Sequence, residues 1–268
     1  MRDQPRSPLT LNLPHQVEIS KKLVDLGYEL CEGVELQVKR KDLIFLALVD
    51  KCFVTSVAIR TLCEQALVDD AFALTRVLIE AVISASYILE SDDQVAEDYA
   101  DYPKFFAWKQ FQDVEAVAPE ITSDATQEER ERMKKDYEAT RERYEKNRNT
   151  DWTKDNIFAR ARMLDTVVGF NLFRSLINVG WRTAGAYVHS TASSLTSRLS
   201  EDEKHVTIRR TATPQEAAGA LYTCNMAMFA LVAAVDLRLG KKKVDIWKEL
   251  YGAWSGTSAS KSPVPPPS

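Results

Sequence analysis

Long apolar segments alternate with short polar breaks along this chain, and the apolar positions mostly recur with the period of an α-helix. The segment 69–90 is apolar nearly all round, which is typical of a helix buried on most of its faces. Other helices are expected on either side of it, at 14–37, 41–67, 92–117, 123–148, 155–167, 170–198 (with breaks at Gly180 and Gly185) and 214–240, and a shorter piece at 244–254. The pattern therefore predicts an all-α fold of about seven or eight helices.

Two kinds of segment depart from this pattern. Residues 123–148 are nearly all polar with balanced charge, which predicts a solvated helix that protrudes from the body. Residues 200–213 contain Val206 and Ile208 in alternation with polar residues, which indicates at most one short strand pair. The expected organisation is a single all-helical domain, 13–254, between disordered ends at 1–12 and 255–268.

Composition places the chain among ordinary globular proteins. Hydrophobic residues make up 45% and charged residues 28% of its 268 positions, and the net charge of −4 gives no general attraction to nucleic acid. The four cysteines lie inside apolar helical segments without a C-x-x-C pair, so we interpret them as reduced core residues of a cytoplasmic protein. The N-terminus has no apolar core and does not resemble a signal peptide.

One stretch approaches the length of a membrane span. Residues 217–235 carry no charge, but they are rich in alanine and include Asn225 near the centre. A core helix with small residues for close packing explains this composition better than a span, and no membrane partner is expected.

A polar row runs along the helix 69–90. Arg76, Glu80 and Ser84 are four residues apart and share a face, and Asp69 extends the row by two turns. Charges on such an apolar helix need partners. Either Arg76 and Glu80 form an internal pair that fixes the helix register, or they line a polar pocket.

Among the three histidines, only His189 lies among small and apolar neighbours, seven residues after Arg182. Seven residues are two helical turns, so both side chains are expected on one face. This R-x(6)-H spacing resembles the R-x(4–6)-H motif of HEPN-type ribonucleases, helical toxins and defence proteins that act without a metal. The resemblance implies that His189 is a general acid or base and that Arg182 binds the phosphate.

A broader resemblance covers about residues 40–200. Three pieces occur in the order found in a bacterial all-helical family known as a domain of unknown function: the R-x-L-x-E helix at 76–80, the W-x(4)-I segment at 152–157, and the Y-R-x-x-S-x-x-V-H stretch at 181–189. In the last piece this chain has Trp181 in place of the tyrosine and Gly185 in place of the serine. The resemblance implies an all-helical fold and no specific activity.

Together these patterns define a candidate catalytic set of Arg76, Glu80, Arg182 and His189, with Glu80 orienting His189. The function indicated is a HEPN-like, metal-independent ribonuclease of the toxin or defence type. The alternative is a non-enzymatic interaction or ligand-binding module in which Arg76, Glu80 and His189 form a structural network. No cofactor or metal motif is present in the sequence. The expected partners are RNA, and a second copy or another protein bound to the helix 123–148.

Overall fold

The computed structural model describes residues 11–33, 39–145, 152–189, 199–201, 206–208 and 212–255. The disorder expected at 1–12 and 255–268 lies outside these residues except at its inner edges, where Asn12 caps α1 and Ser255 ends α11. The described chain is helical apart from one strand pair, which confirms the all-α prediction.

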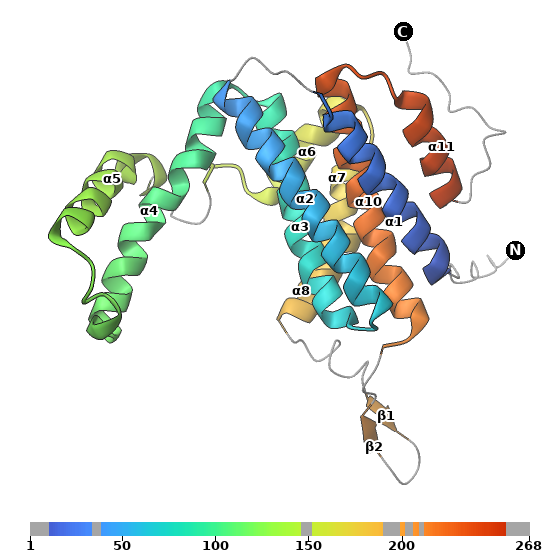
Figure 1. Cartoon of the computed structure of the whole chain (residues 1–268), viewed down its shortest axis with the longest axis horizontal. Coiled ribbons are helices and arrows are strands. Elements are labelled where there is room, and N and C mark those ends of the chain that lie inside the picture. The colour runs from blue at the N-terminus through green and yellow to red at the C-terminus, as the bar shows by residue number, and fades with distance from the viewer. Residues whose placement is uncertain are drawn as a thin grey trace, which may run out of the picture.

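Four long helices form the body of the molecule and lie side by side in Figure 1: α1 (Leu13–Cys31), α2 (Arg40–Glu64), α3 (Val68–Glu90) and α10 (Pro214–Leu239). The central helix is α3, which packs on α2, on α10 and on four further helical segments. Its buried side chains include Leu78, Ile79 and Ile83, each 0% exposed. A helix surrounded in this way has little surface left for polar residues, which explains why its sequence is apolar nearly all round.

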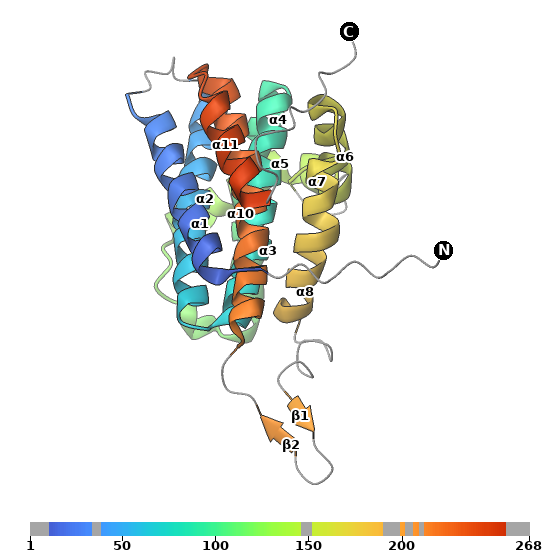
Figure 2. The ribbon, with the colours of Figure 1, turned by 90° about the vertical axis from the view of Figure 1, so that its right-hand side faces the viewer.

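A second layer covers the face of α3 that α2 leaves open. It consists of α6 (Ile157–Val168), α7 (Leu172–Ser175), the π-helical turn η2 (Leu176–Trp181) and α8 (Arg182–Val188), which follow one another along one side of the body (Figure 2). The helical path continues through Gly180 and Gly185, where breaks were expected. Both glycines are buried at close approaches to other helices, so packing accounts for them. The last helix, α11 (Val244–Ser255), packs on α1 and α10.

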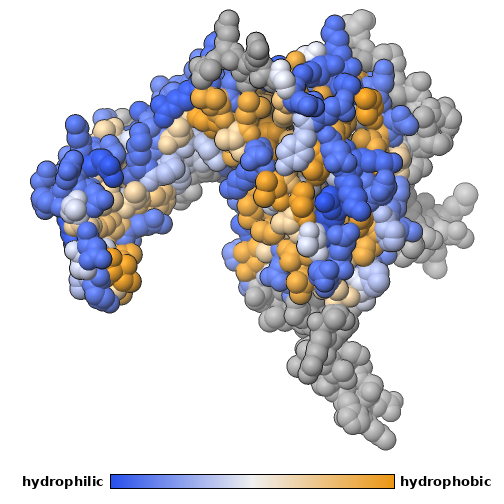
Figure 3. Space-filling model, in the orientation of Figure 1, coloured by the Kyte–Doolittle hydropathy of each residue, from blue (hydrophilic) through white to orange (hydrophobic). Residues whose placement is uncertain are grey.

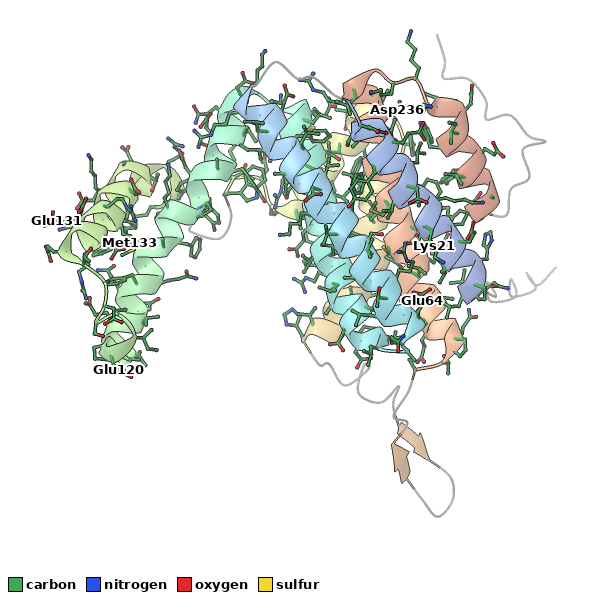
Figure 4. All side chains as sticks on the ribbon, viewed as in Figure 1. Lys21, Glu64, Glu120, Glu131, Met133 and Asp236 are labelled. Atoms are coloured by element: carbon green, nitrogen blue, oxygen red, sulfur yellow. The ribbon has the colours of Figure 1, made fainter. Side chains whose placement is uncertain are left out.

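An arm projects from the body, formed by α4 (Asp93–Val117), the short 3-10 turn η1 (Pro119–Ile121) and α5 (Gln127–Glu145) (Figure 1). Its surface is mostly hydrophilic, and Glu120 lies at its far end (Figures 3 and 4). The charged helix therefore protrudes as expected, but α4 carries it. Phe105 of α4 and Tyr144 of α5, both 0% exposed, form a small aromatic core between the two helices.

Local signals place several helix ends correctly. Thr213 and Glu216 form a capping box with Pro214 in the first turn of α10, and Gly240 ends that helix in the left-handed conformation. The suspected strand is β2 (Val206–Ile208), which pairs antiparallel with β1 (Leu199–Glu201).

Two expected helix ends were wrong. The helix α1 stops at Cys31 instead of near residue 37, because Glu32 is extended and Gly33 adopts a φ of +65°. Asp69 and Asp70 are not the N-cap of α3; they lie in its first turn, and Leu67 is the N-cap. There they still complement the helix dipole.

Two helices, α3 and α10, are long and apolar enough to cross a membrane. Within the described chain both are mostly buried, with 67% and 72% of the relevant windows inside the body. This burial is what a core helix requires, and it agrees with our interpretation of residues 217–235.

The cysteines provide a test of the core. Burial raises the pKa of Cys52, Cys63 and Cys224 to about 12, and it raises the pKa of the half-buried Cys31 as well. Alkylation requires the thiolate, so we expect iodoacetamide at pH 8 to leave the first three unmodified in the native protein and to label Cys31 slowly. Mass spectrometry checks this, with the urea-unfolded protein, labelled at all sites, as the control. Rapid native labelling of Cys224 would contradict the packing described.

Candidate functional site

The polar row of α3 begins with a pair one helical turn apart. Arg76 Nε donates to Glu80 Oε1 at 3.2 Å, and the two side chains are 21% and 46% exposed. The pair is thus at the edge of the core, where water still reaches the carboxylate. An exposed i,i+4 pair alone stabilises a helix only slightly, so the surroundings of the pair decide its importance.

Trp181, the last residue of η2, fixes this pair from the facing helix. Its indole Nε1–H donates to Glu80 Oε1 at 2.6 Å, and the Arg76 guanidinium lies 4.1 Å from the centre of its ring. The indole therefore acts both as a hydrogen-bond donor and as a cation–π surface. A tyrosine, which the resemblance led us to expect at position 181, also has an aromatic face and a donor.

His189 comes to the same place from the end of α8, where it is the C-cap residue and exposed. Its ring Nε2 lies 3.1 Å from Arg76 Nη1. A guanidinium has donors only, so Nε2 accepts this hydrogen bond and the neutral ring carries its proton on Nδ1. We call Arg76, Glu80, Trp181 and His189 the Arg76 cluster.

Gly185, one turn before His189, permits this approach. A Cβ atom on Gly185 would lie 3.1 Å from Arg76 Nη1, which is tighter than ordinary contact. Gly185 is therefore next to the guanidinium, and the absence of a side chain leaves room there for Arg76 to reach His189.

Arg182 does not join the cluster. Its guanidinium lies 5.6 Å from the ring centre of Phe158 on α6, and it is exposed. Among the described residues, no hydrogen bond or ion pair links Arg182 with Arg76, Glu80 or His189. The expectation of a shared face assumed one regular helix through both residues, whereas His189 lies beyond the last residue of α8.

The role expected for Glu80 also changes. No direct contact between Glu80 and His189 is present in the described structure, and Glu80 instead holds Arg76 and Trp181. Its influence on the imidazole therefore passes through the guanidinium of Arg76.

A cavity of about 600 Å³ opens beside the cluster, with Glu80 and Trp181 in its wall. Ser84, the next residue of the polar row, receives a hydrogen bond there from Arg160 of α6 at 3.4 Å. The sequence did not single out Arg160, which is 5% exposed. The only signal was an arginine on the apolar side of a short amphipathic helix, four residues after the N-cap Asn156.

The described part of the chain contains no group of three or more histidine, cysteine, aspartate or glutamate side chains arranged to hold a metal ion. What the Arg76 cluster offers chemically is an imidazole beside a guanidinium. This combination suits proton transfer and the binding of an anion.

Comparison with known proteins gives a family and no closer relative. Residues 42–206 match the family of unknown function DUF5677, which is 165 of the 268 residues. No curated protein and no solved structure matches the chain. The match contains Arg76, Glu80, Trp181, Arg182 and His189, and it carries no information on a link to HEPN ribonucleases. Because the match spans more than half of the chain, this all-helical protein belongs to the DUF5677 family.

Proposed function

We propose that this protein cleaves single-stranded RNA without a metal, as its HEPN-type resemblance implies, and that the Arg76 cluster is the active site. One observation carries the proposal: the exposed imidazole of His189 lies 3.1 Å from the guanidinium of Arg76. A proton-transferring group and a phosphate-binding group are therefore adjacent at the surface.

In the proposed reaction, an RNA phosphate takes the donors of Arg76, which frees Nε2 of His189. The imidazole then removes the proton of the 2′-hydroxyl, and the 2′-oxygen attacks phosphorus. The bond from phosphorus to the 5′-oxygen breaks, the 5′-oxygen takes a proton from water, and His189 returns its proton to the solvent, so the products are a 2′,3′-cyclic phosphate and a 5′-hydroxyl end. Glu80 and Trp181 are positioning residues that hold Arg76, and Arg182 binds a neighbouring phosphate.

The test compares two substitutions of the same residue. His189→Gln keeps an acceptor for Arg76 but cannot transfer a proton, whereas His189→Ala removes both functions. We expect both variants to lose RNA cleavage in EDTA by about 10²-fold or more, because general acid–base catalysis contributes about 10²–10⁴. Cleavage of a labelled RNA is measured by gel, with the matching DNA, which lacks the 2′-hydroxyl, as a substrate control.

His15→Ala is the matched protein control, since His15 is an exposed histidine on α1. Its ring Nε2 is within hydrogen-bond distance, 3.1 Å, of the Ala253 carbonyl. It should cleave RNA at the wild-type rate. An inactive wild-type chain, or a fully active His189→Gln variant, would remove the ribonuclease proposal.

A second candidate is a non-enzymatic binding module in which Arg76, Glu80 and His189 are structural. It is favoured by the mutual pairing of these groups: Glu80 Oε1 accepts two hydrogen bonds, and the lone pair of His189 Nε2 is taken by Arg76. This candidate predicts that His189→Ala lowers the melting temperature and that His189→Gln restores it.

The cellular part of the proposal is a toxin or defence role in the cytoplasm. The free cysteines support the cytoplasmic location, because thiols stay reduced there. Expression of the wild-type chain should arrest growth, and the His189→Gln variant should not. A homodimer and a protein partner at α5 belong to the same proposal; light scattering of the purified protein tests the dimer.

A further inference from the structure

The cavity beside the Arg76 cluster lies at the elbow, where the arm leaves the body. Residues of α2, α3, α4 and α6 line it, together with Trp152 and Trp181. Its volume of about 600 Å³ is within the range of small-molecule sites. Hydrophobic surface gathers on the body near the root of the arm (Figure 3). We call this space the elbow cavity.

Four aromatic side chains lie in the wall of the elbow cavity. Trp152 is 6% exposed, and the ring of Tyr99 packs edge-on against it at 4.9 Å; Tyr102 and Trp181 complete the set. Rings of this kind bury large areas of a flat ligand and prefer offset-stacked or edge-to-face contacts. The shape and chemistry of the walls thus suit a planar ring system.

The charges in the wall favour an anion. Arg160 is 5% exposed and held in place, with its guanidinium 5.0 Å from the ring centre of Trp152 and donating to Ser84. Lys51 is exposed, and it has no ion-pair partner among the described residues. The one carboxylate in the wall is that of Glu80, which is already paired with Arg76. The charge of Lys51, beside a carboxylate that is already paired, attracts a negatively charged group.

We propose that the elbow cavity binds a small planar aromatic molecule that carries one anionic group, such as a mononucleotide or an aromatic carboxylate. The ring lies among Trp152, Tyr99 and Tyr102, and the anion meets Lys51. This inference does not depend on ribonuclease activity.

The elbow cavity and the Arg76 cluster share two residues, so a bound ligand can influence the cluster. Glu80 and Trp181 line the cavity, and the same two side chains hold Arg76 beside His189. A ligand that contacts Trp181 or Glu80 therefore changes how firmly Arg76 is held. The elbow cavity is in this sense a regulatory site for the cluster.

The experiment measures binding to the full chain by calorimetry and by tryptophan fluorescence. The probes form two matched pairs, adenosine 5′-monophosphate with adenosine and indole-3-acetate with indole, so that phosphate and carboxylate are distinguished. We expect at least one anion to bind about tenfold more tightly than its neutral partner, which is what one charge-assisted hydrogen bond supplies.

Two variants of exposed residues locate the site without disturbing the core. Val77→Trp fills the cavity from α3, where Val77 is 41% exposed, and Lys51→Met removes the unpaired cation. Each should weaken binding of the anion about tenfold, while Lys21→Met, an exposed lysine on α1, should not. Failure of both anions to bind, equal binding of anion and neutral partner, or unchanged binding by both cavity variants would overturn the proposal.

Discussion

Replacement of Phe53 by alanine is expected to lower the free energy of unfolding by about 3–5 kcal/mol. Phe53 of α2 is 1% exposed, and its ring is at the contact of α1 and α2, 5.0 Å from the ring of Tyr28. The loss combines the transfer free energy of the ring with the cost of the cavity that remains. Urea unfolding followed by circular dichroism measures the change. Val54→Ala, at a residue 57% exposed on the same helix, is the control and should change stability by less than about 0.5 kcal/mol.

The same contact leads to a second prediction, for Gly27, which faces Phe53 from α1. A Cβ atom on Gly27 would lie 2.3 Å from Phe53 Cζ and 2.5 Å from Cε1, so Gly27→Ala alone should cost about 1–3 kcal/mol. In the Phe53→Ala background this clash is gone, and alanine is the better helix former. The double variant should then be at least as stable as Phe53→Ala. A harmless Gly27→Ala in the wild type would show that the two helices do not pack as described.

Replacement of Asp165 by alanine is expected to cost about 2–4 kcal/mol. Asp165 is 4% exposed at the end of α6, and its carboxylate accepts from the backbone N–H of Phe173 at 2.7 Å and of Arg174 at 3.1 Å. It also pairs with Arg174 Nε at 2.8 Å. Without the carboxylate, buried donors at the start of α7 lose their partner. Thermal melting measures the loss.

Arg174→Gln separates the contribution of the ion pair from that of the two backbone hydrogen bonds to Asp165. The Arg174 side chain is 48% exposed, so its ion pair should contribute less than about 1 kcal/mol. Asp165 also anchors the segment that continues into Trp181 and His189. The Asp165→Ala variant should therefore lose the activities of the Arg76 cluster as well, whereas Arg174→Gln should keep them. Equal losses from both variants would assign the stabilisation to the ion pair.

From the sequence we could predict the features that depend on residues close together in the chain, such as helix ends. The capping box at Thr213 and the terminal Gly240 bound α10 without any knowledge of its neighbours. The row of Arg76 and Glu80 correctly indicated charges in need of partners, because an apolar helix offers few places for them. All-α architecture followed from the same periodicity.

What remained unpredicted depends on which helix faces meet. Trp181 and Arg160 are far from Glu80 and Ser84 in sequence, and their contacts arise from the packing of the second layer on α3. Periodicity gives the apolar side of a helix but not the residue opposite it. The separation of Arg182 from His189 had a different cause, since the helix was assumed to continue regularly through both.

The π-helical turn η2 has a consequence for how the chain tolerates insertions and deletions. In an α-helix each residue advances the side chains by about 100°, and a π-turn accommodates an additional residue within one turn. Loss of one residue within η2 would therefore restore an α-turn and keep the phase of α8, whereas loss of one residue from the regular turns of α8 would rotate His189 by about 100°. Trp181 and His189 would then no longer both face Arg76, although neither residue had changed. The angular phase between Leu176–Trp181 and α8 is thus as much a part of the site as its side chains.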